Sequence, residues 1–576
     1  MTSPRTTPRQ IADRANTPRQ IADRYVDAAC DLDPILATAL GTRPGDDRMP
    51  DTSPVGLEAE ADLARATLAE LEQALAGDPT LDDDPVERRC ARLLRERLGA
   101  QLAAHEAGEG FRSLNNLFSP LHEMRQVFVL MPARSEEDWS VIARRLARLP
   151  EAFRGYRETL SEGARRGLLS APRQVRTVVG QLGEWVDAAY FTGFAAAGPD
   201  ALRGDLDAAA QAADAAVAEM RDFLRDEYAP QAEGTPDAVG RERYVIAARR
   251  WTGSDLGADG GLDEAYAWGW AEHQRILAEQ RAEAEKIVPG ATPMEAMRWL
   301  DVHGEAVQGV EAIRERLQAM MDEAIAALDG THFEIAGPVR EVEAMIAPPG
   351  SAAAPYYTRP SLDFSRPGRT WLPTLGRERF PLWDLVSTWY HEGVPGHHLQ
   401  LAQWVYVAKD LSTYQSTIGS VSANAEGWAL YAERLMDELG FLTDSGARLG
   451  YLDAQQMRAV RVVVDIGMHL QLPIPDDAEG VLAEHRGEPW TPELARAFFG
   501  EHSGRDPQFL DSELVRYLGI PGQAISYKLG ERAWLAGREA ARRARGADFD
   551  LKAWHMAALS QGALGLDDLA AELARL

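Results

Sequence analysis

The amino-acid sequence predicts a mainly α fold, a large multi-helix body with a small strand or extended-loop region inside it. From about residue 18 to residue 330, apolar residues recur at spacings of three and four, as in EEDWSVIARRLARLPEAFRGY, and Ala, Leu, Glu and Arg dominate. Residues 331–381 are instead rich in Pro and Gly, with short β-type runs such as HFEI, YYT and TWLPT. Helical patterns return after residue 381. We therefore expect the strand region to lie just before a helix that carries a histidine cluster.

The composition is that of a globular protein with a large core: the chain has 576 residues, of which 45% are hydrophobic and 26% charged. The octapeptide TPRQIADR occurs twice near the N-terminus, which is too short and too local for a structural repeat. We interpret residues 1–17 as a disordered tail and residues 18–576 as a single large helical domain. Its expected parts are an N-terminal helical half at 18–330, the strand region at 331–381 and a second helical half at 382–576.

The charge balance excludes some classes of partner. Sixty-one basic residues against 89 acidic ones give a formal net charge of −28, so we expect neither a nucleic-acid nor a membrane-surface partner. The N-terminal segment lacks the apolar h-region of a signal peptide, and no stretch supplies the roughly 18 consecutive apolar residues of a membrane span, which predicts a cytoplasmic protein. The two cysteines, Cys30 and Cys90, form no C-x-x-C pair, so any metal ion would be held by histidine and carboxylate side chains.

Residues 389–400, WYHEGVPGHHLQ, begin as the zinc-protease signature H-E-x-x-H begins, but Pro395 stands where the second histidine should be. In an unbroken helix, at about 100° per residue, His397 would point roughly 120° away from His391. His398 would share the face of His391 but sit about 10 Å further along. Neither histidine would then meet His391 at one ion, because Zn–N bonds are only about 2.0–2.1 Å long.

The sequence supplies the means to interrupt this helix. Pro395 has no N–H to donate to the carbonyl of His391, and Gly393 and Gly396 allow unusual backbone dihedral angles. If two extra residues loop out, HEGVPGH reproduces the effect of H-E-x-x-H with His397 as the second ligand. The alternative is an ordinary helix-ending turn followed by two solvated histidines.

A carboxylate is available on the helix that we expect from about Ser422 to Leu439, in the stretch SANAEGWALYAERLMDELG. Glu426 lies near its start, where it is either a first-turn glutamate favoured by the helix dipole or the metal-binding glutamate of a two-helix site. Glu433 lies seven residues on and on the same face, where it is either a hydrogen-bond partner of a ligand or half of a surface ion pair.

The motifs HEGVPGHHLQ and EGWALYAE, supported by RAVRVVVDIGMH at 458–469 and PGQAISYKLG at 521–530, resemble the domain of unknown function 885 family, a group similar to the gluzincin-type zinc metallopeptidases. Weaker similarity in the helices from about 130 to 290 extends the resemblance over most of the chain. The resemblance implies a largely helical fold with a zinc-type site, so 18–576 would be a metallopeptidase-like domain.

The resemblance also implies roles for single residues. It assigns metal-ligand roles to His391, His397 and Glu426, with one Zn²⁺ per chain, and the general-base role to Glu392. Three protein ligands leave one coordination position open, the arrangement of a catalytic rather than a structural zinc. Glu392 could then take a proton from water and pass it to the leaving amine.

The oxyanion of a tetrahedral intermediate needs a further donor, and the late motifs offer two catalytic candidates. Tyr527 carries a phenol that could donate one hydrogen bond, or it is an ordinary core aromatic. His469 follows Asp465 by four residues and Arg461 by eight. One face of a helix could therefore carry all three side chains, so that His469 either binds substrate or belongs to a row of ion pairs along the helix.

Three functions stay open: a zinc metallopeptidase that cleaves short peptides, a metal-dependent hydrolase of a non-peptide amide or ester, and a helical binding protein without catalysis. A binding scaffold has no need of Glu392 beside a three-ligand set, which favours the two enzymes. Tyr356 and Tyr357, on the strand-like segment, could line a cleft in which a peptide adds to a sheet edge. We expect a short peptide or small amide as substrate; its end preference, the choice between His397 and His398, and the oligomeric state stay open.

Overall fold

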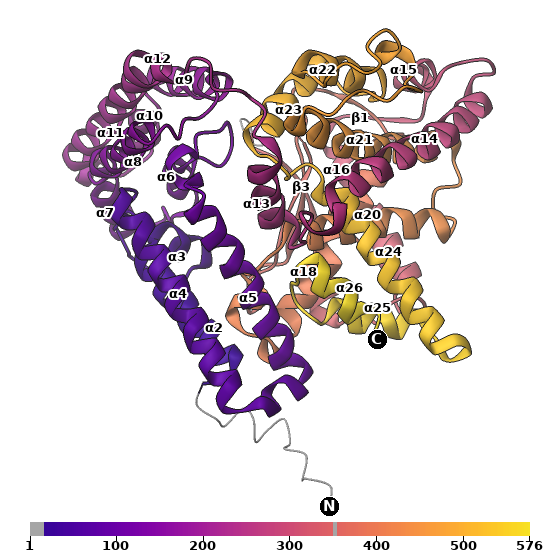
Figure 1. Ribbon diagram of the computed structural model, residues 1–576, viewed down its shortest axis with the longest axis horizontal. Coiled ribbons are helices and arrows are strands. Elements are labelled where there is room, and N and C mark those ends of the chain that lie inside the picture. Colours follow the sequence, from indigo (N-terminus) through magenta and orange to yellow (C-terminus); the bar gives the residue numbers. More distant parts are fainter. Residues whose placement is uncertain (1–15, 349–353) are drawn as a thin grey trace, which may run out of the picture. The chain divides into compact units, whose positions relative to one another are not determined.

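The computed structural model describes residues 16–348 and 354–576, except the side chain of Asp259, and shows a mainly helical protein with a few short strands (Figure 1). The predicted fold class is confirmed, including the small strand region before the helix of His391. The predicted tail at 1–17 lies outside the described residues except for its last two. The chain divides into two compact units, which are described one at a time, and the single domain at 18–576 stays a prediction.

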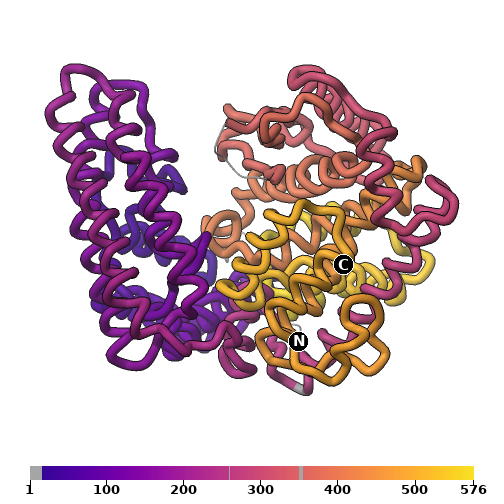
Figure 2. Tube along the Cα trace, turned by 90° about the horizontal axis from the view of Figure 1, so that it is seen from above, coloured from indigo at the N-terminus to yellow at the C-terminus, as the bar shows by residue number. Residues whose placement is uncertain are grey.

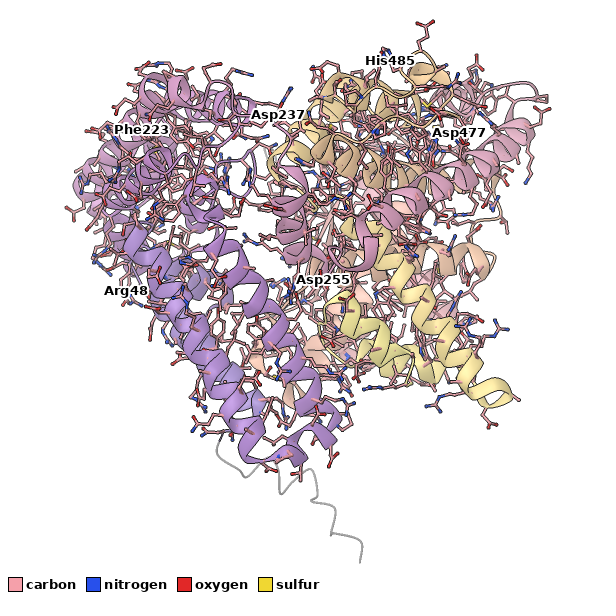
Figure 3. All side chains as sticks on the ribbon, in the orientation of Figure 1. Arg48, Phe223, Asp237, Asp255, Asp477 and His485 are labelled. Atoms are coloured by element: carbon pink, nitrogen blue, oxygen red, sulfur yellow. The ribbon has the colours of Figure 1, made fainter. Side chains whose placement is uncertain are left out.

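Unit 1 consists of the chain up to Asp84 together with 98–239 and 515–520. Its core is apolar, with Phe128, Tyr156 and Phe223 buried, and charged side chains project outward from its helices (Figure 3). The helices assigned wholly to unit 1 are α2 (Pro18–Leu32), α3 (Pro34–Leu40), α4 (Pro54–Gly77), α6 (Pro120–Leu130), α7 (Glu136–Leu146), α8 (Leu149–Arg165), α9 (Pro172–Asp187), α10 (Tyr190–Ala195), α11 (Arg203–Phe223) and α12 (Ala229–Ala232).

Local sequence explains where these helices begin. At α7, the Ser135 side chain accepts the N–H of Asp138 while the Asp138 carboxylate accepts the N–H of Ser135, a capping box that satisfies two helix-end donors. Acidic residues fill the first turn of α7 and basic residues the last, which matches the helix dipole. The periodic stretch EEDWSVIARRL therefore forms the amphipathic helix that the sequence predicts.

Unit 2 consists of 85–97, 240–514 and 521–576. Two helices contribute residues to both units, namely α5 (Pro85–Glu106) and α23 (Pro507–Gly519). The helices assigned wholly to unit 2 are α13 (Gly240–Thr252), α14 (Gly261–Ile287), α15 (Pro293–His303), α16 (Val310–Leu328), α17 (Leu385–Glu392), α18 (His397–Tyr406), α19 (Thr413–Ser416), α20 (Ser422–Glu438), α21 (Ser445–Leu470), α22 (Pro492–Glu501), α24 (Ser526–Arg545), α25 (Leu551–Leu559) and α26 (Leu566–Leu573).

Two small sheets belong to unit 2. In the first, β1 (Ala306–Gln308) pairs antiparallel with β5 (Arg379–Pro381). The second has the order β2-β4-β3, in which β2 (Val342–Ile346) runs parallel to β4 (Gly368–Leu372) and β3 (Tyr356–Thr358) runs antiparallel to it. The YYT run thus forms β3 and TWL lies in β4, whereas HFEI was wrongly taken as strand-like, because it shows only an isolated bridge at Phe333.

The core of unit 2 holds the histidine-bearing helix in place. Trp389 of α17 packs into an apolar cluster with residues of α16, β2 and β4, and its indole N–H donates to the carbonyl of Leu317 at 2.9 Å. On α20, the indole N–H of Trp428 donates to the carbonyl oxygens of Pro395 and Gly396, at 2.9 and 3.1 Å. The helix that carries Glu426 is therefore tied directly to the segment between α17 and α18.

α24 supports α20 by packing against it. Figure 2 shows the C-terminal segment, in yellow, among the orange helices of the same unit. A Cβ atom at Gly427 would collide with the backbone of Gly530, so glycine at both positions permits this close approach. No helix among the described residues is long and apolar enough to cross a membrane.

Candidate metal centre

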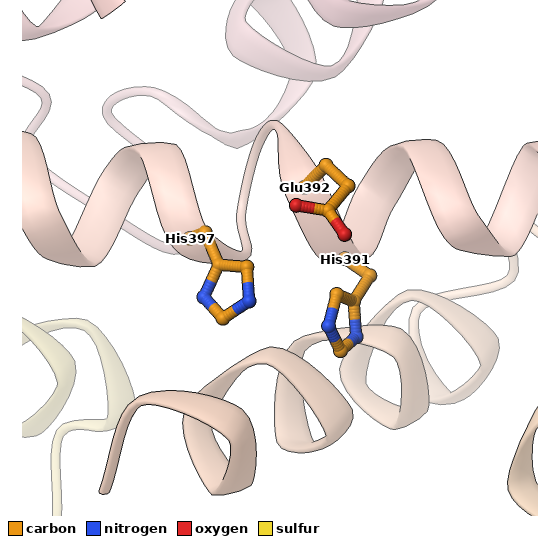
Figure 4. A group of neighbouring side chains, drawn as sticks. All are labelled: His391, Glu392 and His397. Atoms are coloured by element: carbon orange, nitrogen blue, oxygen red, sulfur yellow. The ribbon is translucent and has the colours of Figure 1, made fainter. Parts of the chain in front are cut away.

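The segment 393–396 separates α17 from α18 and brings two histidines together. α17 ends at Glu392, α18 begins at His397, and the N–H of Gly396 donates to the carbonyl of Tyr390 at 3.0 Å. A Cβ atom at Gly396 would collide with the carbonyl oxygens of Tyr390 and His391, so only glycine fits this turn. The imidazoles of His391 and His397 consequently face each other, with ring centroids 4.7 Å apart and planes at 84° (Figure 4).

The carboxylate of Glu426 lies close to both histidines. Its Oε2 lies 3.3 Å from Nε2 of His391 and 3.6 Å from Nε2 of His397. A tetrahedral zinc ion, with bonds of about 2.0–2.2 Å to nitrogen and oxygen, holds its ligand atoms about 3.3–3.5 Å apart. The measured spacings therefore fit a zinc ion between these side chains.

The hydrogen bonding of the same atoms also calls for a cation. Nδ1–H of His391 donates to Oε1 of Glu433 at 2.7 Å, so Nε2 of the neutral ring is an acceptor. It faces Oε2 of Glu426, a buried acceptor atom that has no hydrogen-bond partner in the described part of the chain. Two acceptors at this spacing are stable only with a proton or a metal ion between them.

Glu392 is buried beside the two histidines. One carboxylate oxygen of Glu392 and one nitrogen of each imidazole all lie within 4.8 Å of one another, and Figure 4 shows the carboxylate directed toward the space between the rings. The distances of 3.3 and 3.6 Å from Oε2 of Glu426 to the two Nε2 atoms match the spacing within a zinc ligand set, which favours Glu426 for the predicted ligand role. The predicted general-base role of Glu392 requires that its carboxylate does not coordinate the ion.

The charges at the centre shift the pKa values of its residues. Burial by itself would lower the pKa of His391, but the carboxylates of Glu426 and Glu433 outweigh it and raise that pKa to about 9. Burial by itself would raise the pKa of Glu426, yet His397 and His391 hold that pKa well below its usual range. Burial raises the pKa of Glu392. The centre thus favours positive charge between the ligands and a proton-accepting carboxylate at Glu392.

Glu433 positions the imidazole ring of His391. Besides accepting from His391, it accepts the hydroxyl hydrogen of Ser387 at 2.6 Å, and a guanidinium nitrogen of Arg458 lies 3.9 Å from Oε1. These contacts fix the ring so that Nε2 points toward Glu426. Sequence reasoning missed Ser387 and Arg458, although Ser387 lies four residues before His391 and Arg458 opens the RAVRVVVDIGMH motif.

Replacing Glu433 by glutamine should weaken zinc affinity by about 10- to 100-fold, the usual effect of losing such a supporting carboxylate. Competition against a chromogenic chelator measures this affinity. Glu438→Gln is the matched control, because Glu438 lies on the same helix and pairs with Arg538 at 2.9 Å instead. Equal affinities for the two variants would remove Glu433 from the centre.

His398 points away from this centre. Its Nε2–H donates to the carbonyl of Val339 at 2.7 Å, and its Nδ1 accepts the phenol hydrogen of Tyr357 at 3.0 Å. Burial lowers the pKa of His398 to about 4, which keeps the ring neutral. Since both nitrogens are used, the geometry favours His397 as the second ligand.

The remaining candidates lie in different places. Tyr527 is half-buried on α24, with the guanidinium carbons of Arg461 and Arg458 at 4.9 and 5.9 Å from its ring centroid. Arg458 thus links Tyr527 to Glu433. His469 is fully buried, with Nε2 3.8 Å from Asp465, and lies 11 residues beyond Arg458, about 16 Å along the helix. The structure does not bring His469 to the metal ligands.

The chain resembles known proteins over nearly its whole length. Residues 34–573 match the model of the family described as bacterial protein of unknown function (DUF885). A solved structure from Colwellia psychrerythraea, described as a "putative lipoprotein", is 23% identical with a TM-score of 0.79, covering 97% of this chain and 98% of its own. Another, from Shewanella oneidensis, described as a "putative lipoprotein of unknown function", is 17% identical with a TM-score of 0.74, covering 97% and 100%. At these identities the two structures show a shared fold. No curated protein matches the chain.

Proposed function

We propose that this chain, which belongs to the DUF885 family, is a zinc-dependent metallopeptidase of the gluzincin type that cleaves short peptides. The observation that carries the proposal is the convergence of His391, His397 and Glu426, with Oε2 of Glu426 3.3 and 3.6 Å from the two Nε2 atoms. A His₂Glu set with an open fourth position is the ligand arrangement of catalytic zinc in peptidases. A purely structural zinc site would have four protein ligands.

The residues of the chain account for the proton transfers. When bound, zinc supplies Lewis acidity, which makes a water molecule more acidic and polarises a carbonyl group. Glu392, buried next to both histidines, accepts the proton of the attacking water and returns it to the leaving amine. Glu433 keeps the Nδ1–H of His391 occupied, so the ring presents only Nε2 to the centre.

Tyr527 is the proposed donor to the oxyanion, since it lies beside Arg458, whereas His469 lies far along α21. Tyr527→Phe should lower turnover about 10²- to 10³-fold with little change in substrate affinity, because an oxyanion donor acts as charge develops. Steady-state kinetics with a cleaved peptide measure both quantities. Equal turnover in a folded Tyr527→Phe protein would return Tyr527 to a packing role.

A peptide-pool experiment tests the function. Random short peptides are incubated with the zinc-loaded protein and with the same protein after chelation, and product masses show which bonds are cut. We expect cleavage that disappears on chelation and returns with zinc. Cleavage of simple amides or esters but of no peptide would favour the non-peptide hydrolase. No cleavage of any of these by zinc-loaded protein would favour the non-catalytic binding protein.

A further inference from the structure

Arg359 directly follows β3, the edge strand of the three-stranded sheet. Side chains along a strand alternate between faces, so Arg359 shares its face with Tyr357. Tyr357 donates its phenol hydrogen to His398, the residue after the ligand His397. Tyr356 points to the opposite face, where it stacks on Trp371 with ring centroids 5.8 Å apart.

Arg359 also contacts the segment that leads into the second ligand helix. Its Nη1 donates to the carbonyl of Ser416 at 2.8 Å, at the end of α19 and six residues before α20 begins. The guanidinium therefore lies between β3, the start of α18 and the approach to α20. Those two helices carry His397 and Glu426, so Arg359 lies against the elements that hold two of the proposed ligands.

The positive charge of Arg359 has no acidic partner among residues 16–348 and 354–576. Its one hydrogen bond there is to a backbone carbonyl, and no carboxylate pairs with it. Burial lowers the pKa of Arg359, which indicates a guanidinium that water reaches only in part. A half-buried cation without a counter-charge is costly, and the chain has 89 acidic residues from which a partner could come.

A second arginine adds to the local charge. Arg366 is exposed, its guanidinium donates to the carbonyl of Pro367 at 3.4 Å, and no carboxylate among the described residues pairs with it. Burial raises the pKa of Tyr357, and the charges of Arg359 and Arg366 both oppose this rise, so both arginines lie near the phenol. Asp363 lies between them in the sequence but accepts hydrogen bonds from Ser361 and Ser365, and neither guanidinium forms an ion pair within the described residues.

We propose that Arg359, aided by Arg366, binds a carboxylate group of the peptide substrate. This inference rests on the proposed function and adds the substrate class: short peptides with a free C-terminal carboxylate or an acidic side chain. The planar guanidinium presents paired donors that match a carboxylate in a two-pronged contact.

The test separates binding from cleavage. Zinc-loaded Glu392→Gln protein, which should bind peptides without cutting them, is equilibrated with three pools of N-acetylated random tetrapeptides made from neutral residues. One pool has free C-termini, one has C-terminal amides, and one has C-terminal amides with a single Glu in each peptide. Mass spectrometry measures the fraction of each pool that the protein retains.

We expect one of the two acidic pools to be retained at least about tenfold more than the neutral amide pool, as a hydrogen-bonded ion pair provides. The preferred pool tells which carboxylate is bound, the chain terminus or a side chain. Adding Arg359→Gln should reduce the preference to about twofold or less. Arg359→Lys should restore part of it, which a merely structural role would not do.

Arg369→Gln is the matched control, because Arg369 lies on β4 of the same sheet but pairs with Glu343 at 2.7 Å. Equal retention of the three pools, no retention of any pool, or a preference that survives Arg359→Gln in a folded, zinc-loaded protein would each overturn the inference. An acid preference that depends on Arg359 in a protein that cleaves nothing would instead leave the inference standing and remove the peptidase function.

Discussion

Glu392→Gln is expected to lower peptide hydrolysis by a factor on the order of 10² to 10⁴, the usual contribution of general acid–base catalysis, while zinc and fold are retained. Glutamine has nearly the same shape as glutamate but cannot accept a proton from water. Glu392 is 9% exposed and within 4.8 Å of the ligand nitrogens, so a carboxylate there can reach a water molecule at the centre. Initial rates with a cleaved peptide and metal analysis of the same sample measure the two effects.

Glu426→Gln provides the matched control for that variant. The same chemical change at the proposed ligand should remove a charged oxygen from the ion and so lower zinc content as well as activity. If Glu392→Gln lost zinc while Glu426→Gln kept it, the two carboxylates would have to exchange roles. If Glu392→Gln cleaved peptides at the parent rate, it would not be the base.

The double change of His391→Ala and His397→Ala is expected to abolish stoichiometric zinc binding. The double change removes two of the three proposed ligands, and the single carboxylate of Glu426 that remains is too few ligands for a protein zinc site. Elemental analysis of the purified protein should fall from about one zinc per chain to a small fraction of that.

His398→Ala is the control for this measurement, because both nitrogens of His398 are engaged by Val339 and Tyr357. It should keep its zinc. Full zinc occupancy in the double variant would contradict the ligand assignment. Loss of zinc in His398→Ala would instead indicate that His398, and not His397, is the second ligand.

Much of the fold could be predicted because its helices are amphipathic and their ends are encoded locally. The helix expected from about Ser422 to Leu439 is α20, Ser422–Glu438. The YYT run forms β3, but β1 at Ala306–Gln308 was not foreseen, and HFEI is not a strand. Such short strands depend on partners distant in sequence, as β1 does on β5, and period-2 patterns of three residues carry little information.

The ligands could be predicted from the sequence better than the residues around them. Gly393, Pro395 and Gly396 indicate a break in the helix, and α17 and α18 are indeed separate helices there. The direction in which the His398 ring points depends on its hydrogen bonds to Val339 and Tyr357, which are distant in sequence. The environment of Arg359 also depends on residues distant in sequence, such as Ser416, so the sequence alone does not show that its guanidinium has no acidic partner among the described residues. The cytoplasmic location and the absence of nucleic-acid or membrane partners stay predictions.

The zinc-edge anomalous signal of crystals of the metal-loaded protein bears most directly on whether His391, His397 and Glu426 hold the ion. The geometry predicts one strong peak per chain, about 2.0–2.2 Å from Nε2 of each histidine and from a carboxylate oxygen of Glu426. The carboxylate of Glu392 should lie nearby without coordinating the ion. A zinc-loaded crystal with no peak at these side chains, or with its peak at another group of residues, would contradict the metal centre and the hydrolase built on it.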